Sequence, residues 1–206
     1  MATKKMKFAV TFSASMTLIS FIYKAFLGIY TMSLVLIIAS ISTLLVLIAK
    51  IMFIQTATKT RAQKKKAYLV ITIVTFIYVL IFIAFSVLKV FGIDTSNDKT
   101  YEGIYGAIFI AFLLIMFILS LAKLSDALDK CDLIVIGLKE ITFVSALTDL
   151  VIIEEFVSRI ILNYHYIELM EKINNYFVLG VSIVMIIMPI VMFIRYALYK
   201  PELYRD

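Results

Sequence analysis

Long uncharged apolar runs, separated by short charged segments, are the feature that most constrains how this chain folds. Four runs hold between 18 and 22 residues without a charge: residues 32–49, 67–88, 103–122 and 173–194. An α-helix rises about 1.5 Å per residue, so each run is long enough to cross the roughly 30 Å hydrocarbon core of a bilayer. The pattern therefore predicts an all-α, polytopic membrane protein.

The composition leaves no room for a separate soluble domain. Sixty-three per cent of the 206 residues are hydrophobic, where a soluble domain holds about half. The longest polar stretches, residues 55–66, 92–102 and 125–132, are short, so we predict one membrane-embedded domain over residues 1–206. We interpret the net charge of +6 as loops facing anionic lipid rather than nucleic acid. The single cysteine excludes an internal disulfide, and we expect no cofactor and no metal site.

Charge gaps divide the chain into six expected spans, at residues 8–27, 30–54, 67–91, 103–123, 133–156 and 173–199. Six spans place both termini on one side, and the excess of basic residues makes that side cytoplasmic. A basic loop on this side is expected to face lipid headgroups, through Lys59, Arg61, Lys64, Lys65 and Lys66. We expect Lys24, Lys89 and Arg159 to lie near the opposite interface.

Two spans carry small residues at four-residue spacing, which lets another helix approach closely. The fourth span offers Gly103, Ala107 and Ala111, and the first offers Ala9, Ser13 and Thr17. The neighbour is either another helix of the same chain or another protein, including a second copy of this chain.

The fifth span carries the most charges, at Lys139, Glu140, Asp149, Glu154 and Glu155. Asp149 is the deepest, about 4–5 Å along the axis from the expected bilayer centre at Ala146. An ionisable residue there costs at least about 2.5–3.5 kcal/mol to insert, so we expect it to face other helices. The other four charges are expected at the two interfaces.

Helical periodicity places Thr142 and Ser145 on the same face as Asp149. Three readings of this polar face stay open. It is an ion or proton site, a contact with a partner subunit, or a structural hydrogen bond from Asp149 to a carbonyl or to Tyr78.

Residues 154–159 read EExxxR, which resembles the first motif of the CAAX-protease-like membrane family. That resemblance implies water activation by glutamates together with histidines on later helices. The only histidine, His165, follows Arg159 by six residues, and no FxxxH or HxxxN pattern follows. We therefore interpret the match as fortuitous, expect an ion pair between Glu155 and Arg159, and predict no catalytic residues.

Residues 101–199 are similar to uncharacterised multi-span membrane proteins of low-GC Gram-positive bacteria. The likeness lies in three features: Tyr105-Gly106-Ala107 with Phe112, Lys139 leading into Val144-Ser145-Ala146, and Gly180 in the last span. It implies a multi-pass protein of a bacterial plasma membrane, and no activity.

Three functions are compatible with this pattern. Transport folds use helices broken by Gly or Pro at matched positions, whereas this chain has six Gly and two Pro and no matched interruptions. The pattern thus favours a non-catalytic protein of accessory, interaction or immunity type. A small transporter or an ion or proton channel that uses Asp149 is the alternative, and a membrane enzyme ranks last.

Overall fold

The computed structural model describes residues 2–91, 108, 110–115, 117–119, 132–161 and 167–199. Within these residues the chain is helical and has no β-strand, which confirms the all-α prediction. The long helices are α1 (Ala2–Tyr30), α2 (Leu34–Thr56), α3 (Arg61–Val90), α5 (Leu133–Ile161) and α6 (Ile167–Leu198). A shorter apolar helix lies within Ile110–Leu119.

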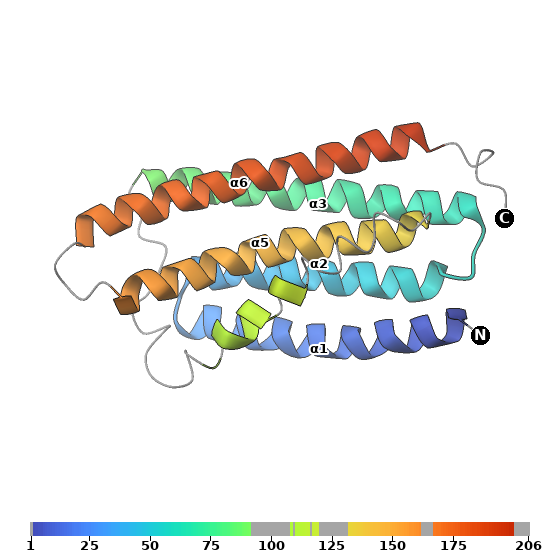
Figure 1. Ribbon diagram of the computed structural model, residues 1–206, viewed down its shortest axis with the longest axis horizontal. Helices are drawn as coiled ribbons and strands as arrows, with labels where there is room; N and C mark the ends of the chain where they lie inside the picture. The colour runs from blue at the N-terminus through green and yellow to red at the C-terminus, as the bar shows by residue number, and fades with distance from the viewer. Residues whose placement is uncertain are drawn as a thin grey trace.

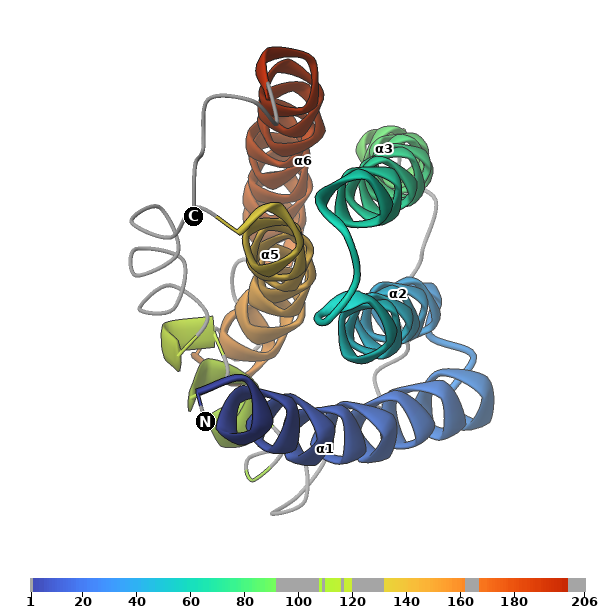
Figure 2. The same ribbon diagram turned by 90° about the vertical axis from the view of Figure 1, so that its right-hand side faces the viewer.

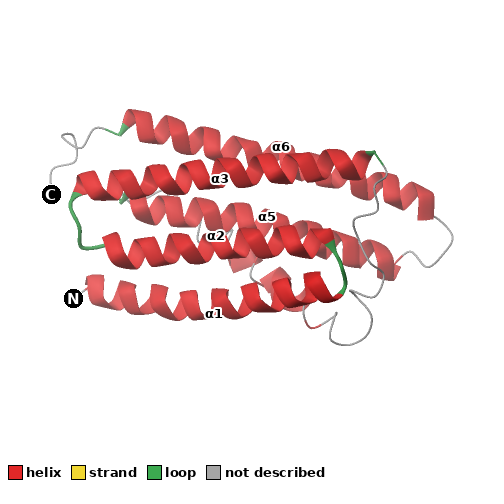
Figure 3. Cartoon of the chain, turned by 180° about the vertical axis from the view of Figure 1, so that it is seen from behind, coloured by secondary structure: helices red, strands yellow, loops and turns green. Residues whose placement is uncertain are grey.

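The long helices run side by side along the length of the molecule (Figure 1). The start of α1, the connection between α2 and α3, the start of α5 and the end of α6 all lie at one end, which we call the basic end. The α1–α2 turn, the end of α3 and the start of α6 lie at the other end, as the view from behind also shows (Figure 3).

α1 and α2 form a helical hairpin with a very short connection. Met32 adopts a positive φ of 51°, and the backbone N–H of Ser33 donates to the carbonyl of Gly28 over 3.0 Å. A Cβ on Gly28 would lie 2.9 Å from the backbone nitrogen of Ile37, so the glycine allows the two helices to meet at the turn. α1 extends beyond the expected residues 8–27 at both ends.

α5 packs against three of the other long helices. Viewed from the end, it lies between α6, α2 and α1, with α3 beside α6 (Figure 2), and it packs against α2, α3 and α6. Tyr78, Phe82 and Phe85 of α3 are buried in the core together with Val144 and Val151 of α5. The helix with the most charges therefore has a largely buried surface.

Four helical segments are long and apolar enough to cross a membrane: Val10–Tyr30, Leu34–Thr56, Arg61–Val90 and Lys172–Leu198. Large apolar side chains also cover the outer surface, such as Ile29 (72% exposed), Ile77 (52%) and Ile194 (54%). Apolar surface of this extent is the mark of a membrane or protein contact, so the described helices fit a transmembrane protein.

The other two expected spans, residues 103–123 and 133–156, are not among these four segments. Most of the expected span 103–123 lies outside the described residues. α5 covers the expected span 133–156 and, with 29 residues, is long enough to cross, but it is not among the four apolar segments. α5 holds six charged residues, which sets it apart from those four segments, and whether it crosses depends on what those charges contact.

Candidate functional site

The polar residues of α5 point to two opposite sides of the helix. Each residue turns an α-helix by about 100°, so Glu140 and Asp149, nine residues apart, lie about half a turn from each other. Glu155 lies close to the direction of Glu140, whereas Thr142 and Ser145 lie close to that of Asp149. We call these the acid-pair face (Glu140, Glu155) and the cavity face (Thr142, Ser145, Asp149).

Asp149 is buried against α1 and forms an ion pair with Lys24. The lysine Nζ lies 2.5 Å from Asp149 Oδ1 and also donates to Thr43 Oγ1 of α2 over 3.0 Å. Lys24 is 1% exposed and Asp149 7%. The ammonium group of Lys24 therefore links α1 to both α5 and α2. Asp149 faces other helices rather than the outer surface.

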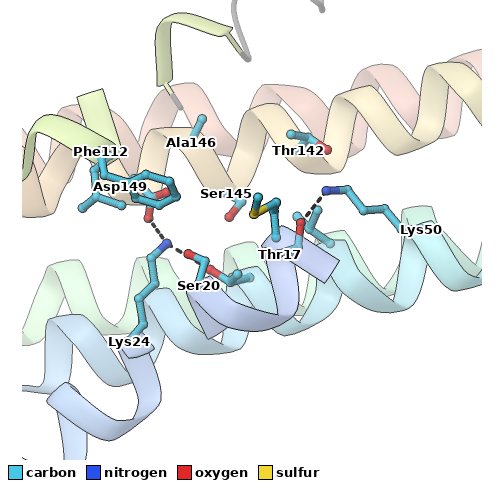
Figure 4. A pocket seen from close by; sticks show the side chains of 13 residues that line it. Thr17, Ser20, Lys24, Lys50, Phe112, Thr142, Ser145, Ala146 and Asp149 are labelled. Atoms are coloured by element: carbon cyan, nitrogen blue, oxygen red, sulfur yellow. Dashed lines mark hydrogen bonds and ion pairs between the residues drawn. The ribbon is translucent and has the colours of Figure 1, made fainter. Parts of the chain in front are cut away.

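A cavity of about 50 Å³ adjoins this ion pair. Its walls come from α1, α2, α5 and the short helix, and they include all three residues of the cavity face (Figure 4). The Ser145 and Ser42 hydroxyls lie 3.1 Å apart, and Thr142 donates to the Leu138 carbonyl. The structure thus brings together the three polar residues that the sequence singled out.

Lys50 of α2 reaches the same cavity from the side nearer the basic end. Its Nζ donates to the backbone oxygen and the hydroxyl of Ser13, over 3.1 and 2.8 Å, and to the Thr17 hydroxyl. Lys50 is 6% exposed. Ser13 and Thr17 belong to the small face expected on α1, so the helix that approaches there is α2 of the same chain.

The acid-pair face contacts α3 and α6 instead. Glu140 accepts from Arg195 of α6 and from the Tyr68 hydroxyl, the latter over 3.0 Å. Glu155 accepts from Lys89 of α3. Both carboxylates are buried, at 2% and 1% exposure. Each buried carboxylate of α5 named so far thus bonds to a base from a different helix.

Two further hydrogen bonds lie on this side of α5. Lys89 also donates to Asn174 Oδ1 of α6 over 3.3 Å. The hydroxyls of Tyr78 and Thr148 lie 2.7 Å apart, so Tyr78 contacts Thr148 and not Asp149 as one reading suggested.

Four of the charges that were expected near the interfaces point into the bundle. Lys24 and Lys89 are buried in ion pairs, and so are Glu140 and Glu155. Glu155 pairs with Lys89 across two helices, while the side chain of Arg159 lies outside the described residues, as does His165. The sequence did contain a signal for the roles of Lys24 and Lys50. Each is a basic residue within an otherwise uncharged expected span, and a carboxylate deep in the membrane, such as Asp149, requires a basic partner.

Of the expected basic loop, Arg61, Lys64, Lys65 and Lys66 lie in the first turns of α3 rather than in a loop, and some of them bond within the bundle. Lys64 forms an ion pair with Asp132 over 2.7 Å. Lys65 donates to the carbonyl of Tyr199 over 3.0 Å, and its Nζ lies 4.9 Å from the centre of the Tyr196 ring. Lys59 and Lys66 are exposed, and Arg61 is half-buried. Only part of this loop is therefore directed outward.

The remaining predicted features are described only in part. Ala111 is exposed, whereas Gly103 and Ala107 lie outside the described residues. Among the described residues, no group of three or more His, Cys, Asp or Glu side chains is arranged to hold a metal ion. No family model, curated protein or solved structure matches this chain, so the site must be interpreted from its own chemistry.

Proposed function

We propose that the chain is a six-span protein of a bacterial plasma membrane with both termini on the cytoplasmic side. In support, the start of α1, the α2–α3 connection and the end of α6 share the basic end. α3 ends at the opposite end from the start of α5, so the chain between them must return along the bundle. The expected span at residues 103–123 accounts for that return.

Reporter fusions test this topology. Fusions after Lys66 and after Lys130 are expected to report cytoplasm, and a fusion after Lys99 is expected to report the outside. An external signal after Lys66 would contradict the proposal, because that loop carries the densest positive charge.

Within this topology we infer a non-catalytic role of accessory, interaction or immunity type. The observation that supports it is the pairing on α5: Glu140, Asp149 and Glu155 bond to bases of α6, α1 and α3. Charges used in this way fix which helices neighbour each other, the best-attested role of buried ionic groups. The cavity of about 50 Å³ is much smaller than the 300–1,000 Å³ typical of organic ligand sites.

The partners that fit this role are the lipid bilayer and another membrane protein or a second copy of this chain. The fourth span offers a surface for such a partner through Gly103, Ala107 and Ala111. Gene neighbours give a first indication of its kind: a secreted-toxin gene next to this one favours immunity, and an ATPase gene favours a subunit of a transport complex. Nucleic acid is not proposed as a partner.

A flux assay tests the non-catalytic role against the alternative, a small transporter or an ion or proton channel through Asp149. The alternative is favoured by one observation, the cavity beside the Lys24–Asp149 pair. The purified protein is reconstituted into vesicles with a pH or potassium gradient. We expect the gradient to decay as slowly as in protein-free vesicles. Faster decay that Asp149→Asn abolishes, in folded protein, would establish the alternative instead.

The absence of peptidase activity is tested separately. Glu154→Ala and Glu155→Ala are compared with the parent protein on a quenched fluorescent peptide in the same vesicles. We expect no hydrolysis in any of the three, and hydrolysis by the parent that both variants lose would show that the EExxxR match is functional.

A further inference from the structure

Several charged and polar side chains reach the cavity beside Asp149, although most of its lining is apolar. Around its edge stand two ammonium groups, one carboxylate and several hydroxyls, from Lys24, Lys50, Asp149, Thr17, Thr142 and Ser145. Empty cavities in proteins are lined by apolar groups, whereas roomy polar cavities hold water. The charged and hydroxyl groups next to Asp149 are therefore the part of the lining that favours bound water.

The volume determines what can occupy it. One water molecule needs about 10–15 Å³ of such space, and the cavity offers about 50 Å³. This is room for roughly three or four water molecules and too little for an organic ligand. Phe112 and Leu113 of the short helix also line the cavity, which is partly open.

Lys24 and Asp149 keep a donor and acceptor positions that such water molecules can use. A lysine ammonium has three donors, and Lys24 directs two of them to Asp149 and Thr43. Asp149 Oδ1 accepts from Lys24, and a carboxylate has about four acceptor positions. The Asp149 side chain keeps 10% of its surface open while Lys24 keeps 2%. Because Asp149 lines the cavity, that surface is available to its contents.

We propose that this cavity is an internal water site, in which a small cluster of water molecules connects the Lys24–Asp149 pair to the hydroxyls of Thr142 and Ser145. The cluster supplies the third donor of Lys24 with an acceptor and the carboxylate with further donors. It thereby lowers the desolvation penalty that otherwise disfavours a buried ion pair. The site is independent of the proposed function, because an accessory protein and a channel both permit it.

The test is transfer of magnetisation from water to side chains in the full chain, by solid-state NMR in lipid bilayers with labelled Ser and Thr. We expect rapid transfer to Thr142 and Ser145. Thr72 and Ser86 are the matched controls, because both are 0% exposed and donate to carbonyls of their own helix. We expect no rapid transfer to them.

A variant whose side chain fills the cavity provides the second part of the test. Ala146 lines the cavity and is 5% exposed, so Ala146→Leu places added carbon atoms where the water is proposed. We expect transfer to Thr142 and Ser145 to fall to the level of Thr72, with the other resonances unchanged. Ala146→Val serves in its place if the leucine variant does not fold. Transfer at Thr142 and Ser145 that equals the Thr72 control in the parent, or that persists in the filled variant, would overturn the proposal.

Discussion

The two faces of α5 use the same chemistry in different surroundings. On the acid-pair face, Glu140 and Glu155 bond to α6 and α3 beside tightly packed side chains. On the cavity face, Asp149 bonds to α1 next to a cavity of about 50 Å³. The comparison shows that a buried carboxylate does not by itself define a functional site. The role of the carboxylate depends on whether packed side chains or a cavity lie next to it.

The two faces also differ in how far their basic partners lie from the end of a helix. Lys89 is the penultimate residue of α3, so its ammonium lies near the end of the bundle, whereas Lys24 lies six residues before the end of α1. A long basic side chain near a helix end can extend to the headgroup level when its partner is lost. Loss of Asp149 leaves Lys24 with no such route.

The largest effect is expected for Asp149→Leu, which leaves the Lys24 ammonium buried without its carboxylate. Removal of one partner of a buried pair costs about 3–5 kcal/mol, to be measured as the free energy of unfolding in an SDS titration. Asp149→Asn keeps an acceptor for Lys24 and is expected to lose less.

The double variant Lys24→Leu with Asp149→Leu is the control for this result. It removes both charges, so it is expected to recover most of the loss. A double variant as unstable as Asp149→Leu would show that the pair is not what stabilises this face.

Glu155→Leu applies the same change to the acid-pair face. We expect a loss of about 1.5–3 kcal/mol, the range for hydrogen bonds to charged groups, because Lys89 can then reach the headgroups. The same titration measures it. If Glu155→Leu proves as costly as Asp149→Leu, depth does not distinguish the two faces.

Gly137→Ala tests how tightly α5 packs against α3. A Cβ there would lie 2.7 Å from the ring of Tyr68, a side chain that is 0% exposed and bonded to Glu140. We expect a loss of about 1–3 kcal/mol from overpacking, seen as a lower unfolding midpoint. Gly180→Ala is the matched control, since no heavy atom lies within 4 Å of its added Cβ. A neutral Gly137→Ala would mean that this side is as loosely packed as the cavity face.

The smallest effect is expected for Thr148→Val, which removes the bond to Tyr78. Hydrogen bonds between membrane helices contribute about 0.6 kcal/mol on average. Thr75→Val is the control, because Thr75 is equally buried but donates to Ile71 of its own helix. The difference between the two variants in the SDS titration isolates the interhelical bond, and a difference of zero would contradict its contribution.

Much of the fold was predictable because hydropathy and helix length act locally. Five of the six expected spans coincide with the long helices α1, α2, α3, α5 and α6, and these include α5 despite its charges. The polar group of Thr142, Ser145 and Asp149 was predictable too, because residues three and four apart share a helix face. The burial of charges such as Lys24 and Glu155 in ion pairs was not predictable, since position along a helix does not show which side is buried.

The sequence alone determined that the chain is a bundle of apolar helices, and that an acid in the middle of one of them needs a partner. It did not determine which partner, because several bases lie at similar positions along their spans and the energetic requirement is the same for each. Only the tertiary structure decided that Asp149 bonds to Lys24, 125 residues away, and that Glu155 bonds to Lys89. The physical reason is that a helix presents its charges by rotation about its axis, and packing against the neighbouring helices sets that rotation.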